Sequence, residues 1–287
     1  MEPGKYAFFE RDNLELGLSL NYGPRISLIR YQGGPNLMVQ MPEPALPEDW
    51  AVYGGHRVWA APEHPVRSYW PDNSPPLVQK DGDIKVSAWN VDGSGLRRTV
   101  GIEMLDAGSC LVRNEITNFG EESQVLASWG ITSLIPGGIG LMPFGSCGKG
   151  LNPNRQLAFW PYTQIKDPSI EEFDCMICVD QQKLTGKFKI GTWHEAGWLA
   201  YLVQDWLFVK RSEARQPGNY PDLNSNLEIY GDLDMLELET LAPLTNLEPG
   251  ESMAHTEQWW LRQVASSKDK TERLEMALDL VVALLGD

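Results

Sequence analysis

Apolar and polar residues alternate with a period of two through most of this chain. The clearest alternating segments are 13–20, 25–31, 96–105, 109–119 and 124–134, and a denser series begins at residue 187. Turn-forming residues stand between them, as in Tyr22-Gly-Pro24 and Pro136-Gly-Gly138. A period of two indicates strands with one buried face, and short strands separated by turns are typical of antiparallel sandwiches. We therefore expect an all-β fold of packed antiparallel sheets.

One segment near the C-terminus has helical periodicity instead. Its apolar residues Leu274, Ala277, Leu278, Val281 and Leu285 follow Asp269-Lys-Thr-Glu272, which resembles a helix cap and an acidic first turn. We expect this helix to pack its apolar side on the outside of the sheets, with a role in binding a partner as the alternative. No linker-like change in composition divides the chain, so residues 1–287 are expected to form a single domain.

The charge balance excludes some classes of partner. The chain has 24 basic and 39 acidic residues, a formal net charge of −15 at pH 7. Such a chain repels phosphate backbones and anionic lipid surfaces, so we expect neither nucleic acid nor a membrane as partner. The longest aliphatic run, Leu280 to Leu285, is far shorter than a membrane span, and residues 1–10 do not resemble an export signal. We expect a cytoplasmic protein; the oligomeric state stays open.

Cysteine and histidine are few and lack metal-binding spacing. The cysteines are Cys110, Cys147, Cys175 and Cys178, and the histidines are His56, His64, His194 and His255. Cys175 and Cys178 have redox spacing, but alternation around them predicts a strand, in which positions three apart face opposite sides. We expect a structural role for this pair, reduced thiols, and neither metal nor cofactor.

The segment from Tyr53 to Asp72 concentrates aromatic and charged side chains. Its members of interest are His56, Arg57, Trp59, Glu63, Trp70 and Asp72. Proteins that bind sugars use flat aromatic faces for the C–H side of the ring and charged groups for its hydroxyls. The segment therefore predicts part of a saccharide site. The alternative is a tightly packed loop in which Arg57 merely pairs with Glu63.

A second cluster lies in the strand-like segment 235–241. Alternation places Glu237 and Glu239 on one face, where two neighbouring carboxylates raise each other's pKa and favour a general base. The alternative is a solvated face at the edge of a sheet. A glycosidase would need a second acid across the scissile bond, which Glu63, Asp72 or Glu228 could supply. Lys210, near the end of another expected strand, could reach a ligand oxygen.

Several segments resemble, in order, motifs of the galactose mutarotase-like (aldose 1-epimerase-like) superfamily. They are Asn21-Tyr-Gly-Pro-Arg-Ile-Ser-Leu28, Tyr53-Gly-Gly-His-Arg57, Asn114-Glu-Ile-Thr-Asn-Phe-Gly120, Leu236-Glu-Leu-Glu-Thr240 and Leu247-Glu-Pro-Gly-Glu251. The resemblance covers most of the chain and implies a supersandwich of antiparallel strands with a sugar cleft. The run from Gly54 to Glu63, continued by Pro71-Asp-Asn73, is similar to a separate branch of that superfamily.

The resemblance also implies roles for individual residues. Glu239 matches the base that removes the proton from the O1 hydroxyl, and His56 matches a histidine that binds or assists. Arg57 or Lys210 would hold hydroxyl groups. The segment Leu126 to Leu134 lacks the histidine that serves as the family's acid, so His56 is expected to replace it.

Three functions remain open on the sequence alone. The first is a sugar epimerase or mutarotase with Glu239 and His56 as base and acid. The second is a carbohydrate-binding module without turnover, in which Trp59, Trp70 and Trp129 stack on the sugar. The third is a carbohydrate hydrolase or lyase. In each, the partner is a small-molecule sugar or sugar derivative.

Overall fold

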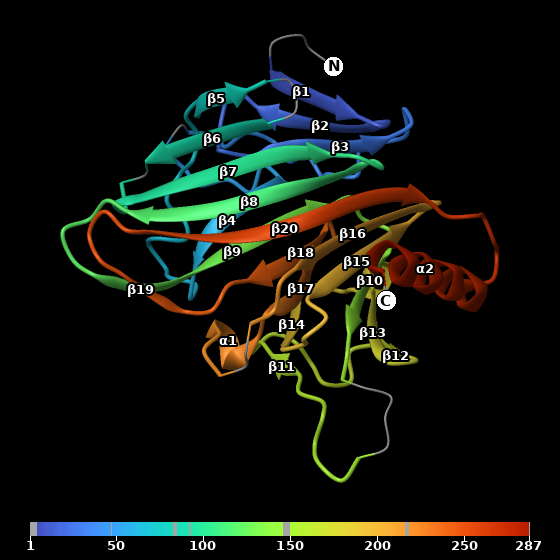
Figure 1. The fold of residues 1–287 in the computed structure, drawn as a ribbon. Coiled ribbons are helices and arrows are strands. Elements are labelled where there is room, and N and C mark those ends of the chain that lie inside the picture. The colour runs from blue at the N-terminus through green and yellow to red at the C-terminus, as the bar shows by residue number, and fades with distance from the viewer. Residues whose placement is uncertain are drawn as a thin grey trace.

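The computed structural model describes residues 5–46, 48–82, 85–91, 93–145, 150–215 and 218–286, which form two large antiparallel sheets and a C-terminal helix. Figure 1 shows the two sheets lying face to face. The all-β sandwich and the external helix expected from the sequence are confirmed. The assignment of residues 1–287 to a single domain stays a prediction.

The first sheet has the strand order β1-β2-β3-β4-β9-β18-β17-β14-β11, with β19 paired to β9. Its strands are β1 Tyr6–Arg11, β2 Leu14–Ser19, β3 Ile26–Tyr31, β4 Gly55–Ala61, β9 Gln124–Leu134, β11 Ala158–Phe159, β14 Phe188–Thr192, β17 Leu227–Gly231, β18 Leu236–Leu241 and β19 Thr245–Leu247.

The second sheet has the order β12-β13-β10-β15-β16-β20-β8-β7-β6-β5. Its strands are β5 Leu77–Asp81, β6 Lys85–Val91, β7 Leu96–Leu105, β8 Ser109–Asn118, β10 Ile139–Pro143, β12 Ile170–Phe173, β13 Met176–Asp180, β15 Trp198–Val203, β16 Trp206–Ser212 and β20 Ser252–Gln263. The helical elements are η1 Gln181–Lys183, α1 Pro221–Asn224 and α2 Lys270–Leu285.

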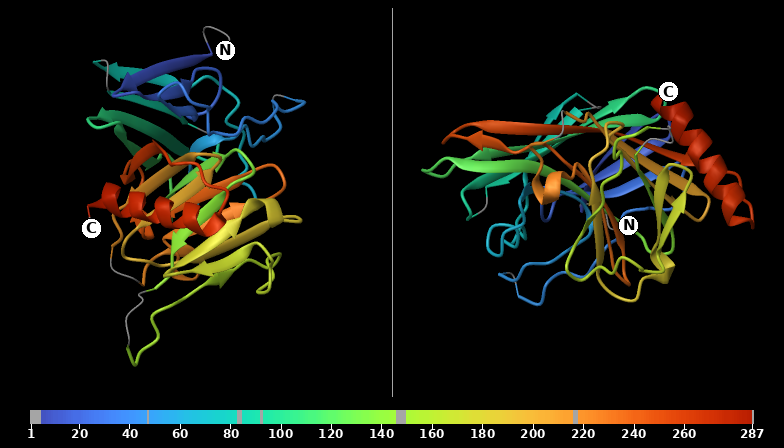
Figure 2. Two further views of the ribbon diagram at one scale, coloured as in Figure 1. Left: turned by 90° about the vertical axis from the view of Figure 1, so that its right-hand side faces the viewer. Right: turned by 90° about the horizontal axis from the view of Figure 1, so that it is seen from below.

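Helix α2 covers the outer face of the second sheet (Figure 2). Its buried residues Leu274, Ala277 and Val281 join a cluster with Leu207 and Val209 of β16. The Asp269 side chain accepts a hydrogen bond from the backbone N–H of Glu272, which caps the first turn. The apolar stripe and the N-terminal cap expected from the sequence are therefore both present in α2.

The main core lies between the two sheets and is not wholly apolar. Leu236 and Leu238 of β18 and Val58 of β4 contribute to it from the first sheet. Lys210 and Glu257 of the second sheet are also fully buried in the interior. Charged side chains inside a sandwich are costly unless paired, so their partners determine the local structure.

The described cysteines differ partly from expectation. Cys110 and Cys178 are buried free thiols, whereas Cys175 is disulfide-bonded. The expectation of reduced thiols is therefore wrong for Cys175, and Cys147 lies outside the described residues. No helix among the described residues is long and apolar enough to cross a membrane.

Candidate functional site

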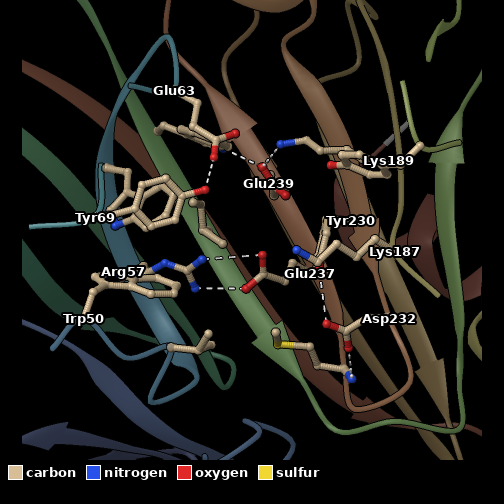
Figure 3. Close-up of a pocket in the computed structure, with 16 residues that line it drawn as sticks. Trp50, Arg57, Glu63, Tyr69, Lys187, Lys189, Tyr230, Asp232, Glu237 and Glu239 are labelled. Atoms are coloured by element: carbon tan, nitrogen blue, oxygen red, sulfur yellow. Dashed lines mark hydrogen bonds and ion pairs between the residues drawn. The ribbon is translucent and has the colours of Figure 1, made fainter. Parts of the chain in front are cut away.

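A cleft of about 320 Å³ opens on the outer face of the first sheet, over β4, β9, β18, β17 and β14. Figure 3 shows the side chains that point into it. Its aromatic lining residues are Trp50, Trp59, Tyr69, Trp129, Tyr162 and Tyr230. Its acidic lining residues are Glu63, Asp232, Glu237 and Glu239, and its basic ones are Arg57, Lys187 and Lys189.

Strand alternation determines which residues reach this cleft. In β4, Arg57 and Trp59 line it, while Val58 packs into the core between the sheets. In β18, Glu237 and Glu239 line it while Leu236 and Leu238 face the core. The two clusters singled out from the sequence therefore meet, because β9 lies between β4 and β18 and pairs with both.

Arg57 and Glu237 form a buried ion pair across the cleft floor. Nη1 of Arg57 lies 2.9 Å from Oε1 of Glu237, and the Ser133 hydroxyl donates to the same oxygen at 2.5 Å. Burial alone would raise the pKa of Glu237, but Arg57 and Ser133 outweigh it and lower the pKa below its usual value. Glu237 is thus a fixed anion with its charge already neutralised.

Glu239 has a different environment. Its Oε2 accepts from the Trp129 indole N–H at 2.7 Å and from Nζ of Lys189 at 2.8 Å. Burial and the neighbouring Glu237 raise the pKa of Glu239, although Lys189 opposes them. In Figure 3, Arg57 and Lys189 approach the two glutamates from opposite sides. A carboxylate with a raised pKa in an aromatic cleft is suited to accepting a proton.

Glu63 and Tyr69 form the mouth of the cleft. The Tyr69 hydroxyl donates a hydrogen bond to Glu63. Burial and this neighbouring carboxylate raise the pKa of Tyr69 to about 12, so the phenol stays protonated at neutral pH. Both residues are exposed and therefore available to a ligand entering the cleft.

His56 is not in the cleft. It lies on the opposite face of β4, with Nδ1 2.9 Å from Oγ1 of Thr132 and Nε2 2.8 Å from Oδ1 of Asn114. Its side chain is fully buried, and burial lowers its pKa to about 4. The expected partnership of His56 with Glu239 is incompatible with this geometry, since the sheet itself separates the two side chains.

Lys210 also faces the interior. Its Nζ lies 2.9 Å from Oε1 of Glu257 and 3.0 Å from Oγ1 of Thr132, with no exposed surface. The expectation that Lys210 holds a sugar hydroxyl is wrong. One face of β16 packs against the first sheet and the other is covered by α2, so both faces are buried. Alternation alone could therefore not show which face meets the first sheet.

Trp70 and Asp72 lie outside the cleft as well. The Trp70 ring packs directly against Gly93, where a Cβ would lie 2.0 Å from the ring. Asp72 accepts from Nη2 of the buried Arg25 at 2.8 Å, and its backbone carbonyl accepts from the N–H of Gly23. These two residues anchor the loop that carries Glu63 and Tyr69, which is a structural role.

Lys189 lines the cleft and donates a hydrogen bond to Glu239, and it was not among the site residues expected from the sequence. Its ammonium lies 4.4 Å from the Trp129 ring centroid and 4.7 Å from that of Trp160. A lysine between Phe188 and Ile190, in the middle of an apolar strand, was the available signal. Trp50, Tyr162 and Tyr230 were also missed, because loops or distant strands bring them to the site.

No protein-family model matches the sequence, and no curated protein matches it. Solved structures do match. A galactose mutarotase-like protein from Lactobacillus casei is similar with a TM-score of 0.57 and 12% identity, over 90% of this chain and 100% of that one. The chain has the galactose mutarotase-like fold.

Two further structures show how widely this fold occurs. An aldose epimerase homologue from C. elegans matches with a TM-score of 0.56 and 11% identity, over 91% of this chain and 100% of that one. A TPR-domain containing protein from Parabacteroides distasonis matches with a TM-score of 0.62 and 13% identity, over 90% of this chain and 47% of that one. At such identities the likeness establishes the fold, and function has to be argued from the cleft itself.

Proposed function

We propose that this protein binds a free sugar or sugar derivative in the cleft and interconverts its anomers, with Glu239 as the general base. The observation that carries the proposal is the position of Glu239, a buried carboxylate with a raised pKa, at the bottom of an aromatic cleft. Trp50, Tyr162 and Tyr230 offer apolar faces to the C–H side of a pyranose. The solved relatives described as mutarotase-like or as an aldose epimerase homologue agree with this chemistry.

The reaction needs a base and an acid that act on O1 and O5, the two oxygens bonded to the anomeric carbon C1. Glu239 removes the proton from the O1 hydroxyl while an acid protonates the ring oxygen O5, and the C1–O5 bond opens. The ion pair of Arg57 and Glu237 fixes the positions of hydrogen-bonding groups on the cleft floor, which can then orient the remaining hydroxyl groups of the sugar.

A binding module without turnover is the second candidate. None of the described residues that line the cleft is a histidine, the residue type that the family resemblance gives as acid. Such a protein would retain the aromatic faces and the Arg57–Glu237 pair but would have no proton donor for O5.

Polarimetry and saccharide titration separate the two candidates. Freshly dissolved α-anomers of a panel of aldoses should equilibrate faster with the protein than in buffer, and Glu239→Gln should remove the acceleration while tryptophan quenching by the sugar persists. Glu171→Gln, a surface change in β12, is the matched control. Saturable quenching without acceleration would favour the binding module, and absence of both would contradict the sugar site.

A further inference from the structure

Lys189 is shared between two buried carboxyl groups. Its Nζ lies 2.8 Å from Oε2 of Glu239 and 2.8 Å from Oε2 of Glu228, and all three side chains are buried. Glu228 and Glu239 face each other across β17 and β18. One ammonium can neutralise one carboxylate, and a second unpaired negative charge in such a site is costly. One of the two carboxyl groups therefore holds a proton.

The position of Asp222 indicates where that proton lies. The carboxyl groups of Asp222 and Glu228 lie close enough to act on each other's pKa. Neither side-chain oxygen of Glu228 accepts a hydrogen bond from an N–H or O–H group of the described residues, although Oε2 lies 2.8 Å from Nζ of Lys189. Two carboxyl groups can form a hydrogen bond only when one of them is protonated. Burial raises the pKa of both groups, which agrees with a shared proton.

The backbone around Asp222 is held in a costly conformation. Asp222, Leu223 and Asn224 have φ values of 52°, 58° and 67°, three consecutive left-handed residues without glycine. Each such residue costs of the order of 1–3 kcal/mol, so the surroundings must impose this turn. It brings the half-buried Asp222 against Glu228 on one side and into a second pocket of about 150 Å³, beside Trp160, on the other. Asp222 thus connects the buried cluster to solvent.

We propose that Lys189 is the acid that protonates the ring oxygen of the sugar, and that the Glu228–Asp222 pair supplies the proton that restores it. This inference rests on the proposed function. It supplies the proton donor for O5 that a histidine would otherwise provide, since no described residue lining the cleft is a histidine. Nζ of Lys189 and Oε2 of Glu239 are 2.8 Å apart. O1 and O5 of a pyranose are bonded to the same carbon, so an acid and a base this close can address both oxygens.

Every proton that moves in this reaction has a donor and an acceptor among the sugar, Lys189 and the three carboxyl groups. Glu239 takes the O1 proton, the O1 electron pair forms the C1=O1 bond, the C1–O5 bond breaks, and O5 takes a proton from Lys189. The neutral Lys189 amine then takes the shared proton of Glu228 and Asp222. Glu239 ends neutral and the Glu228–Asp222 pair ends with one more negative charge, so the net charge of the buried set is unchanged. Ring closure on the other face of the aldehyde reverses each transfer.

The tyrosines are weaker candidates for this role. Tyr69 already donates its hydroxyl hydrogen to Glu63 at the exposed mouth of the cleft. Tyr230 donates to Asp232 at 3.1 Å. Lys189 is the cation in direct contact with Glu239, and its ammonium lies between two indole faces. Burial alone would lower the pKa of Lys189, but Glu228 and Glu239 outweigh it and raise the pKa above its usual value, so Lys189 carries a proton at neutral pH.

Glu228→Gln tests the proposal, because glutamine has the shape and charge of a protonated glutamate but cannot release the proton. We expect it to keep saccharide quenching and thermal stability while the anomerisation rate falls at least tenfold at pH 7. Lys189→Met should remove the acceleration altogether, with circular dichroism confirming that it folds. Glu171→Gln is the control. A wild-type rate in Glu228→Gln or in folded Lys189→Met would overturn the proposal.

Infrared difference spectroscopy gives a readout independent of turnover. At pH 7 wild-type protein should show the C=O stretch of a protonated carboxyl group, and this band should be absent from Glu228→Gln. Absence of the band from the wild type would overturn the shared proton even if anomerisation is fast. A present band with saccharide binding but no acceleration would instead refute catalysis, and with it Lys189 as acid, while leaving the sugar site intact.

Discussion

Lys210 of β16 and Glu257 of β20 face each other between the two sheets, with Nζ 2.9 Å from Oε1 and neither side chain exposed. Nζ also donates to the backbone carbonyls of Gly130 and Leu238, each at 3.1 Å. These carbonyls belong to β9 and β18, the strands that carry Trp129 and Glu239. The pair therefore ties the second sheet to the strands that form the cleft floor.

Lys210→Met should destabilise the protein by about 3–5 kcal/mol, because it leaves Glu257 buried without a cation. Glu257→Gln should also destabilise it by leaving Lys210 unpaired. The double variant should be less destabilised than the sum of the two, since no uncompensated charge remains. Denaturant unfolding of all four proteins measures this coupling, and strictly additive losses would contradict it.

Stability should decrease as the pH falls from about 6.5 to about 4. Burial lowers the pKa of His56 and of His255 from 6.5 to about 4. Between these pH values the histidines bind protons in the unfolded chain but not in the folded one. No stability is lost above pH 6.5, and the loss grows as the pH falls until it reaches roughly 3 kcal/mol for each histidine below the folded pKa. His56→Gln should flatten the dependence of the unfolding free energy on pH in this window, and an unchanged slope would refute the assignment.

Strand alternation explains both what the sequence could predict and what it could not. It correctly placed Glu237 and Glu239 on one face, and the same rule applied to β4 puts His56 and Arg57 on opposite faces. The rule failed for Lys210 because both faces of β16 are buried. The sequence shows Lys189 as an unusual lysine inside an apolar strand but does not place it in the cleft, because its partners Glu228 and Glu239 lie some 40 and 50 residues away. They meet Lys189 only through pairing of β14, β17 and β18.

Trp129→Phe should raise the pKa of Glu239 while keeping the ring in the cleft. The indole N–H donates to Oε2 of Glu239 at 2.7 Å, and a hydrogen bond to a charged group contributes about 1.5–3 kcal/mol. Its loss corresponds to a pKa increase of about one unit or more. The acid limb of the anomerisation rate should move to higher pH by that amount, and carboxyl NMR titration of Glu239 should show the same shift. A change in saccharide affinity without any pKa shift would indicate that Trp129 serves only as a stacking face.

A sugar phosphate should bind at least tenfold more weakly than the parent sugar. Arg57 is already paired with Glu237, and Lys189 is paired with Glu239 and Glu228, so neither cation is available to neutralise a phosphate. Among the described lining residues, Lys187 at the exposed rim is the cation without an ion pair, and Glu63 and Asp232 face the same opening. With a net charge of −15, the whole chain repels an incoming dianion, and added salt screens that repulsion.

Tryptophan-quenching titrations with a hexose and its 6-phosphate at low and high salt measure the difference in affinity, which should shrink at high salt. Equal or tighter binding of the phosphate, lost in Lys187→Gln, would mean instead that the rim lysine is a phosphate site.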